Sequence, residues 1–404
     1  MNPQAIPAPA AGADSSGTAR APDPLPVRPG PATGAAASPA RLPSLDGLRA
    51  FAILCILLTH ATTTFHFPAQ ALLRRPLGVV GLLGVEIFFV LSGFLVATTL
   101  LRETDLAGRL SLKKFWTRRA LRILPVFLCL VVVLIVLRVA GYIYIRPRGW
   151  IELATFTVNF RYHPRWSVGH LWFLALEVHF YLMFPLVVRW LAPRKVVGVL
   201  LGTLAFCFAA RWLSLLFFRH DPVFMEMIEY MTFTRLDSLA AGCLLAYAVH
   251  DPARRRRVDA VLTRPAVVTA CIIMVLAILA ICTRVWWFLP AVGNTALALL
   301  LPVIVWAALR RPRAAAARFL NTRSFVALGL ASYSVYIWQQ LFLFQDRPGF
   351  VHNFPQNVLF TLLAAAVSYT LIERPFLNLK QRYAVVPLEA LASWDAPAGQ
   401  LAKG

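Results

Sequence analysis

The sequence predicts an all-α integral membrane protein with about ten transmembrane helices and both termini in the cytoplasm. Three observations support this fold class. The 404 residues are 59% hydrophobic and 14% charged, with a mean hydropathy of +0.67, whereas soluble domains are about a quarter charged. Apolar runs of roughly 20 residues recur, and each is long enough to cross a bilayer. Lys and Arg gather in alternate loops between these runs, which is typical of a fixed membrane orientation.

The apolar runs define the expected helices in chain order. They lie at about 47–65, 78–101, 123–145, 168–191, 196–218, 232–250, 265–283, 287–309, 324–345 and 354–375. Residues 1–42 are rich in Ala, Pro and Gly without an apolar period, so we expect a disordered cytoplasmic tail. One membrane domain at 43–377 should therefore be the functional unit, with a cytoplasmic C-terminal tail at 378–404.

The formal net charge of +22 would suggest a nucleic-acid partner for a soluble protein. If the N-terminus is cytoplasmic, however, the cytoplasmic loops carry 20 Lys and Arg residues and the external loops carry ten. This is the positive-inside pattern, so we expect a multi-pass protein of the cell inner membrane that contacts the lipid bilayer and binds no nucleic acid. One external loop, 146–167, departs from the pattern with Arg146, Arg148, Arg161 and Arg165, which favours an acidic ligand on the outer side.

The six cysteines all fall in or at the end of apolar runs. None has the spacing of a metal site or of a disulfide framework. We therefore expect them to pack as small hydrophobic side chains, and we expect neither a metal site nor a resident cofactor.

Arg49 and His60 are the strongest candidates for function, and both lie in the first apolar run. At 1.5 Å per residue they are roughly 16 Å apart along a helix, and eleven steps of about 100° bring both side chains to the same face. Ionisable side chains are costly inside a bilayer and usually serve a pathway or a reaction. Arg stays charged and can hold an anion, whereas neutral His can accept a proton. The pair predicts an anion-binding group and a proton acceptor aligned across the membrane.

Two carboxylates lie deep within later helices. Glu86 falls in the segment GVEIFFVLSGF, in which Gly93 allows close helix approach. Glu177 shares one helical face with His170, which we expect at the outer mouth about 10 Å away by helix rise. An unpaired carboxylate facing lipid would be strongly unfavourable. We therefore expect both to point into a cavity within the bundle, with at least one orienting His60.

A basic cluster lies in the segment FWTRRALRILP of the most basic cytoplasmic loop. Its guanidinium groups belong to Arg118, Arg119 and Arg122. Clustered guanidinium groups hold phosphates bidentately. The alternative interpretation is a topology signal that attracts anionic lipids.

Four other charged residues lie near the outer ends of expected helices. Arg235 and Asp237 occur in RLDSLAAG, at an outer helix mouth. Arg138 and Arg211 lie in the outer thirds of their spans. Long basic side chains at such depths can extend toward the headgroups, so we expect both of these arginines to snorkel.

Taken in order, these segments resemble the membrane acyltransferase 3 family over roughly residues 43–377. LDGLRAFAILCILLTH resembles its first signature and GVEIFFVLSGF its second, in which Asp is common where this chain has Glu86. RRALRILP resembles its cytoplasmic arginine motif, and HLWFLALEVHFY, RLDSLAAG, SYSVYIW and ERPF resemble later blocks. Two features depart from the pattern. Gln339 follows SYSVYIW where the family often has His, and no hydrolase-like domain follows, so the chain resembles the stand-alone type.

The resemblance implies O-acylation of a sugar hydroxyl in a cell-surface glycan, a glycolipid or a secreted metabolite. The acyl group is most commonly acetyl, and acetyl-CoA on the cytoplasmic side would be its donor. Because CoA is a polyanion, its phosphates would bind the clustered guanidinium groups of Arg118, Arg119 and Arg122.

The catalytic hypothesis assigns a role to four residues. The acyl thioester enters the bundle past Arg49, and His60 removes the hydroxyl proton of the acceptor as general base. Glu86 or Glu177 orients His60 and stabilises its charged form, as an acid does for a catalytic His. Since no Ser or Cys stands out as an acyl carrier, direct transfer is favoured over an acyl-enzyme.

Two other functional classes fit parts of the sequence. A multi-pass transporter or flippase of a glycan or glycolipid precursor would also carry intramembrane ionisable residues. Carriers often show internal repeats and helices broken by Gly or Pro, and neither is clear in this sequence. A non-catalytic membrane subunit of a glycan assembly complex would leave Arg49 and His60 without a role.

Overall fold

The computed structural model describes residues 43–161, 166–344 and 349–385. Every regular element in these ranges is a helix, and none is a strand, so the all-α prediction is confirmed. The expected tail 1–42 and residue Arg165 lie outside the described residues, as does the expected tail beyond residue 385. The cytoplasmic location of both termini stays a prediction.

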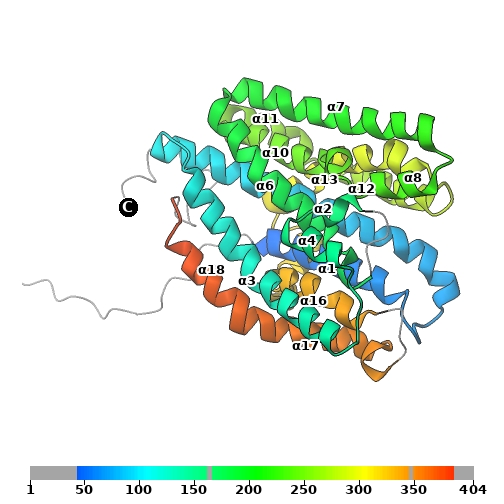
Figure 1. Ribbon diagram of the computed structural model, residues 1–404. Helices are drawn as coiled ribbons and strands as arrows, with labels where there is room; N and C mark the ends of the chain where they lie inside the picture. The colour runs from blue at the N-terminus through cyan, green and yellow to red at the C-terminus, as the bar shows by residue number, and fades with distance from the viewer. Residues whose placement is uncertain (1–42, 162–165, 345–348, 386–404) are drawn as a thin grey trace, which may run out of the picture. The chain divides into compact units, whose positions relative to one another are not determined.

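The helices follow one another along the chain with short connections (Figure 1). The principal helices are α1 (Pro43–Ala61), α2 (Gln70–Ala107), α3 (Leu112–Val139), α6 (Trp172–Trp190), α7 (Pro193–Phe218), α10 (Asp237–His250), α12 (Pro265–Cys282), α13 (Asn294–Arg310), α16 (Ser332–Phe342) and α17 (Gln356–Ser368). The shorter helices are α4 (Pro147–Ala154), α5 (Trp166–Gly169), α8 (Pro222–Ile228), α9 (Thr232–Arg235), α11 (Pro252–Leu262), α14 (Ala315–Leu320), α15 (Arg323–Leu330) and α18 (Arg374–Gln381). Two short 3-10 turns are η1 (Val158–Phe160) and η3 (Phe350–His352), and two π-helical turns are η2 (Leu289–Gly293) and η4 (Tyr369–Glu373).

Eight helical segments in the described part of the chain are long and apolar enough to cross a bilayer. The two expected spans that do not qualify, 232–250 and 324–345, are each divided into two helices, α9 with α10 and α15 with α16. Near the first break, the carbonyl of Thr234 accepts a hydrogen bond from the guanidinium of Arg211. A backbone acceptor inside a membrane protein must be satisfied, and this side chain does so where the regular helix is interrupted. The number of helices that cross the membrane stays a prediction.

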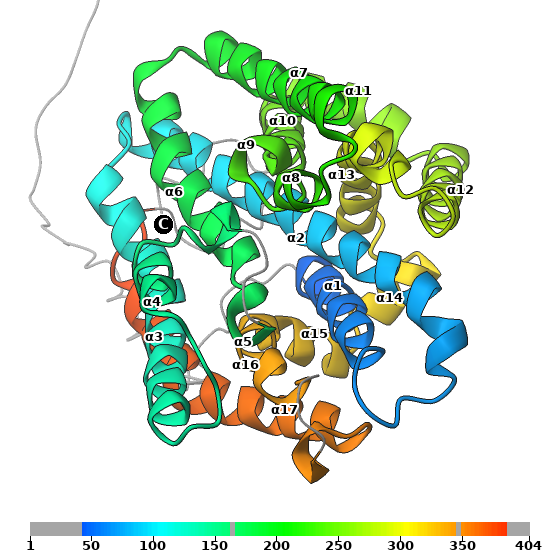
Figure 2. The ribbon, with the colours of Figure 1, turned by 45° about the vertical axis from the view of Figure 1, so that its right-hand side comes forward.

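Helix α2 packs along both α1 and α10, and α1 also packs against α15 (Figure 2). The contact between α2 and α10 depends on two glycines. A Cβ atom on Gly93 would lie 2.0 Å from the carbonyl oxygen of Leu239, and one on Gly242 would lie 2.1 Å from that of Val90. Small residues let membrane helices approach at backbone distance, so the expected role of Gly93 is confirmed.

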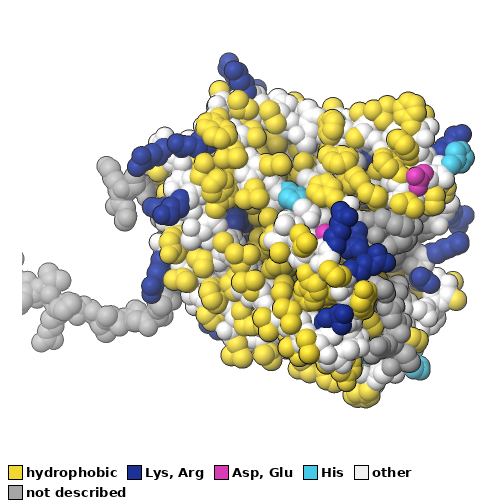
Figure 3. All heavy atoms as spheres, in the orientation of Figure 1, with side chains coloured by type: hydrophobic (Ala, Val, Ile, Leu, Met, Phe, Trp, Pro, Cys, Tyr) yellow, Lys and Arg dark blue, Asp and Glu magenta, His cyan; other side chains and the backbone are white. Residues whose placement is uncertain are grey.

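Helices α3, α16, α17 and α18 pack together on the side of the bundle away from α7 (Figure 1). The outer surfaces of α3, α17 and α7 carry large exposed apolar side chains, for example Val132 and Val136 on α3 and Leu216 on α7. In Figure 3, hydrophobic side chains cover most of the visible face, and Lys and Arg lie toward its left and right edges and in a patch right of its centre. An apolar surface with charged edges is typical of a bundle that spans a bilayer.

Candidate functional site

His60 and His170 line the same cavity of about 400 Å³. The cavity lies among α1, α2, the α5–α6 segment and α16, and its wall is mostly apolar and aromatic. Trp166, Trp172 and Tyr230 contribute aromatic surface. A concave apolar cavity with a few convergent polar groups is typical of a small-molecule site.

His60 pairs with an amide. Its Nδ1 lies 3.2 Å from the Oε1 of Gln339 on α16, and its ring meets the indole of Trp166 edge-on at a centroid distance of 5.5 Å. Within the described residues, neither Glu86 nor Glu177 is a hydrogen-bond partner of His60. We expected a carboxylate to interact with His60 directly or through one water, and the described structure contains no direct hydrogen bond of this kind.

His170 repeats this arrangement with the next residue of α16. Its Nδ1 lies 2.9 Å from the Oε1 of Gln340, and its Nε2 lies 3.3 Å from the carbonyl oxygen of Ile337. The hydroxyl of Tyr336 donates to the backbone carbonyl of His170. Two consecutive glutamines of α16 thus contact two histidines, one on α1 and one between α5 and α6.

Glu177 lies away from the His60 cavity. Its carboxylate accepts a hydrogen bond from the hydroxyl of Ser92 on α2, and Glu177 lies within electrostatic range of Arg119 and Tyr181. The carboxylate therefore points into the bundle, as expected, but it lies near Arg119 of the basic cluster rather than near His60. Glu177 is separated from the cavity because it follows His170 by seven residues, which is about 10 Å along a helix.

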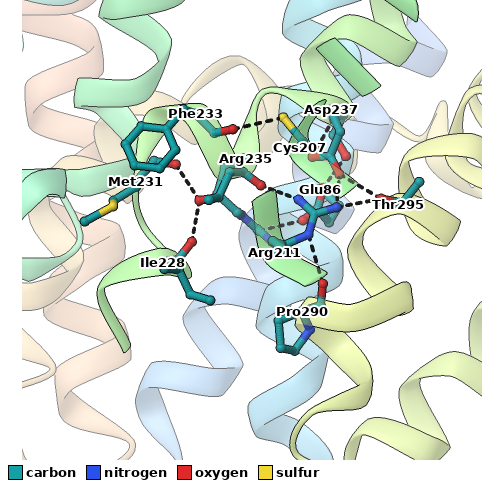
Figure 4. Close-up of polar contacts among 12 residues, drawn as sticks. Glu86, Cys207, Arg211, Ile228, Met231, Phe233, Arg235, Asp237, Pro290 and Thr295 are labelled. Atoms are coloured by element: carbon teal, nitrogen blue, oxygen red, sulfur yellow. Dashed lines mark hydrogen bonds and ion pairs between the residues drawn. The ribbon is translucent and has the colours of Figure 1, made fainter. Parts of the chain in front are cut away.

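Glu86 is also buried, but its partners lie on α9 and α10. Its Oε1 lies 2.6 Å from Nη2 of Arg235, and the hydroxyl of Ser238 donates to its other oxygen. A second ion pair lies beside it, with 2.7 Å between Nη2 of Arg211 and a carboxylate oxygen of Asp237 (Figure 4). The snorkelling expected of Arg211 is wrong, because its side chain is 1% exposed.

This buried charge network supports one wall of the cavity. The guanidinium of Arg235 lies 5.8 Å from the ring centroid of Trp172, and Trp172 lies 5.1 Å from the ring of Tyr230. Both rings line the cavity that contains His60. Burial, followed by the nearby Glu229 and Glu226 carboxylates, raises the pKa of Tyr230 to about 12, so its phenol remains a hydrogen-bond donor in neutral solution.

Arg49 is paired within its own helix. One of its guanidinium nitrogens donates to the carboxylate of Asp46, three residues earlier, at 2.8 Å. Arg49 is nevertheless within electrostatic range of Arg122 on α3 and of Glu373 at the end of η4. The first helix therefore contributes Arg49 to the basic end of the bundle and His60 to the cavity.

The three arginines of α3 have different surroundings. Arg118 forms a 2.6 Å ion pair with buried Glu103 and donates to the carbonyl of Tyr383 at 2.9 Å. Arg119 lies over the rings of Phe115 and Tyr181, at 5.4 and 4.8 Å from their centroids.

The remaining arginine, Arg122, has no hydrogen-bond or ion-pair partner for its side chain within residues 43–161, 166–344 and 349–385. The three residues thus lie together as expected, but Arg118 is engaged by a protein carboxylate. Arg119 and Arg122 are the members of the cluster with free hydrogen-bonding capacity toward an anion.

Lys380 is a member of this basic cluster that the sequence did not reveal. It lies on α18, which packs against α3, and it is within electrostatic range of Arg49, Arg119 and Arg122. The sequence assigned position 380 to the C-terminal tail. A signal was present, because Lys380 follows Glu373 of the ERPF block by seven residues and shares its helical face.

The external loop 146–167 is only partly engaged with the cavity. Arg161 lines it, but its guanidinium lies 2.6 Å from the carboxylate of Glu152, which is also 3.4 Å from Arg148. Residue Arg165 is outside the described ranges. Among the described residues, no group of His, Cys, Asp and Glu side chains has the arrangement of a metal site.

Comparisons with known proteins point to one family. Residues 42–373 match the profile of the acyltransferase 3 family, whose description is "Acyltransferase domain". The chain is 29% identical over 365 residues to the O-acetyltransferase OatA of Staphylococcus aureus (strain NCTC 8325 / PS 47), covering 84% of this chain and 57% of that protein. It is 27% identical over 373 residues to a putative O-acetyltransferase of Staphylococcus aureus (strain COL), covering 83% and 57%. The chain thus spans less than two thirds of these relatives, and no solved structure matches it.

Proposed function

Because this chain belongs to the acyltransferase 3 family, we propose that it is a membrane O-acyltransferase that moves an acyl group, most commonly acetyl, from cytoplasmic acyl-CoA to a sugar hydroxyl. The observation that carries the proposal is the position of His60. It lies in a cavity large enough for a small molecule, on the same helix as Arg49 of the basic cluster. Eleven residues of helix separate the two, or roughly 16 Å.

The donor site that we propose consists of Arg119, Arg122 and Lys380, with Arg49 beside them. These cations come from α3, α18 and α1, and they lie within electrostatic range of one another. Within the described residues, Arg119, Arg122 and Lys380 have no carboxylate partner, whereas Arg49 is paired with Asp46. Clustered cations of this kind favour a bound polyanion, and the phosphates of CoA meet that requirement. Arg118 has a smaller part in this site, because Glu103 already neutralises it.

The acceptor site that we propose is the cavity around His60. Its aromatic wall suits the apolar face of a sugar ring, and its polar groups can position a hydroxyl. His60 would remove the proton of that hydroxyl as general base, which is typically worth about 10²–10⁴-fold in rate. The acceptor would be a sugar in a cell-surface glycan, a glycolipid or a secreted metabolite, and the enzyme would lie in the cell inner membrane.

Glu86 and Glu177 support these two sites indirectly in our proposal. Glu177 balances the positive charge of the donor site through Arg119. Glu86 holds Arg235 against Trp172 in the wall of the acceptor cavity. Neither carboxylate needs to touch His60 for the transfer to proceed.

The proposed function is tested by an acyl-transfer assay with isolated membranes. Membranes that contain the protein are incubated with acetyl-CoA labelled in the acetyl group, and label is measured in extracted glycan, glycolipid and small-molecule fractions. We expect label in one fraction, its loss with His60→Ala, and its retention with His220→Ala, a histidine on the exposed external loop. Absence of transferred label from well-expressed wild-type protein in every fraction would contradict the proposed function.

A further inference from the structure

The imidazole of His60 has one hydrogen-bond partner within the described residues, and that partner is an amide oxygen. The Oε1 of Gln339 lies 3.2 Å from Nδ1 of His60. A carboxamide oxygen can only accept a hydrogen bond, so the arrangement in which Oε1 faces the imidazole assigns the proton of this bond to Nδ1. In a neutral imidazole the other nitrogen then has the free lone pair. The contact therefore leaves Nε2 of His60 as the basic atom.

The position of Gln339 is set by the surrounding helices. Its side chain is fully buried, at 0% exposed. Two hydrogen bonds tie α16 to the segment before α6, because Tyr336 donates to the carbonyl of His170 and the indole of Trp166 donates to the carbonyl of Leu343. The second bond also fixes the indole that meets the His60 ring edge-on.

The imidazole is thus held by an amide at Nδ1 and by an indole against its ring. We infer that Gln339 is the positioning residue of the acyl-transfer site: it holds His60 in the tautomer whose Nε2 can accept a proton. This inference rests on the proposed function, in which His60 is the general base. An amide oxygen carries a partial charge, so Gln339 orients the ring without the full stabilisation of imidazolium that a carboxylate partner supplies. In this chain an amide therefore has the orienting role expected of Glu86 or Glu177.

The first test compares substitutions at position 339 with a matched control. Gln339→Met keeps the length of the side chain and removes the acceptor, so kcat for acyl transfer should fall roughly 10–100-fold, the range typical of partners that orient a metal-ligating His. The KM for acyl-CoA should be unchanged, because the donor site lies elsewhere. Gln339→Glu keeps an acceptor and should restore most of kcat. It should also move the acidic limb of the pH–rate profile to higher pH, since a carboxylate favours imidazolium.

The control is Gln356→Met at the start of α17, outside the cavity, which should retain wild-type kcat and pH dependence. Equal kcat in Gln339→Met and wild type, with transfer still lost in His60→Ala, would overturn the role of Gln339 and leave the proposed function intact. Failure of the wild type to transfer any acyl group would instead overturn the proposed function.

The second test needs no substitution at position 339 and no turnover. Protein labelled with ¹⁵N in histidine is examined by NMR in lipid, and the His60 resonances are assigned by their loss in His60→Ala. The inference requires a protonated Nδ1 and an unprotonated Nε2 in the neutral ring. The opposite tautomer would exclude the role assigned to Gln339, whatever the activity of the variants.

Discussion

Arg211 and Asp237 form an ion pair inside the bundle, with 2.7 Å between Nη2 and a carboxylate oxygen and with each side chain 1% exposed. The same guanidinium donates to the carbonyl of Pro290 in π-helix η2 at 2.9 Å and to the carbonyl of Thr234 beside the break between α9 and α10. Arg211 therefore satisfies backbone acceptors at two places where regular α-helix is interrupted. In the low-dielectric interior such acceptors would otherwise remain unpaired.

Arg211→Ala should strongly destabilise the protein. Removal of one partner of a buried pair leaves an uncompensated charge and typically costs about 3–5 kcal/mol, and here two backbone acceptors also lose their donor. The measurement is the thermal midpoint of purified protein in detergent or nanodiscs. Arg138→Ala is the matched control, because Arg138 was expected to snorkel like Arg211 but has an exposed side chain. Equal midpoints for the two variants would show that the Arg211–Asp237 pair has no structural role.

The sequence was sufficient to predict the fold class. Long apolar runs can satisfy their backbone only as helices inside a bilayer, and every regular element of the described chain is a helix. The spans 232–250 and 324–345 were the exceptions, because hydropathy does not detect a helix break. At the first, the interruption coincides with a hydrogen bond to Arg211, which comes from a helix earlier in the chain.

The candidate site was only partly predictable, for a related reason. The spacing of Arg49 and His60 within one helix is a local property, and the structure places Arg49 near the basic cluster and His60 in the cavity. The partner of His60 was not local, since Gln339 is 279 residues away in sequence. The free-energy cost of burying a carboxylate indicated that Glu86 must have a partner. It could not show whether that partner was Arg235 or His60.

His60→Ala and Arg49→Ala should each abolish most acyl transfer while the protein still inserts. Loss of the general base should lower the rate by about a hundredfold or more. Loss of Arg49 removes a cation beside the donor site and leaves Asp46 without its partner. The measurement is transfer of labelled acetyl per amount of protein in the membrane fraction. Near-normal transfer by well-expressed His60→Ala protein would contradict the mechanism.

Lys380→Ala and Arg118→Ala should distinguish the residue of the basic cluster that binds acyl-CoA from the residue that stabilises the fold. Lys380→Ala should raise the apparent constant for acyl-CoA, because a lost charge-assisted phosphate contact costs about 1.5–3 kcal/mol. Arg118→Ala should mainly lower the thermal midpoint, since it leaves Glu103 buried without its cation. Both are measured by titration of acyl-CoA in the transfer assay and by thermal unfolding. Because Lys and Arg in these loops also influence topology, the orientation of each variant must be checked by labelling. An unchanged acyl-CoA constant in correctly oriented Lys380→Ala protein would remove Lys380 from the donor site.

Glu229 should make the stability of the protein fall as pH rises. It lies between α8 and α9, outside the eight candidate spans, and burial raises its pKa from the ordinary 4.5, against the opposing effect of Arg235. The folded state therefore binds this proton more tightly than the unfolded state, so its contribution is complete below the ordinary pKa and is lost as pH rises through the raised value. Glu229→Gln removes this dependence. The measurement is the thermal midpoint of Glu229→Gln minus that of wild type, which should be larger at pH 8 than at pH 4.5. A constant difference between the two proteins across this range would show that Glu229 does not change its protonation on folding.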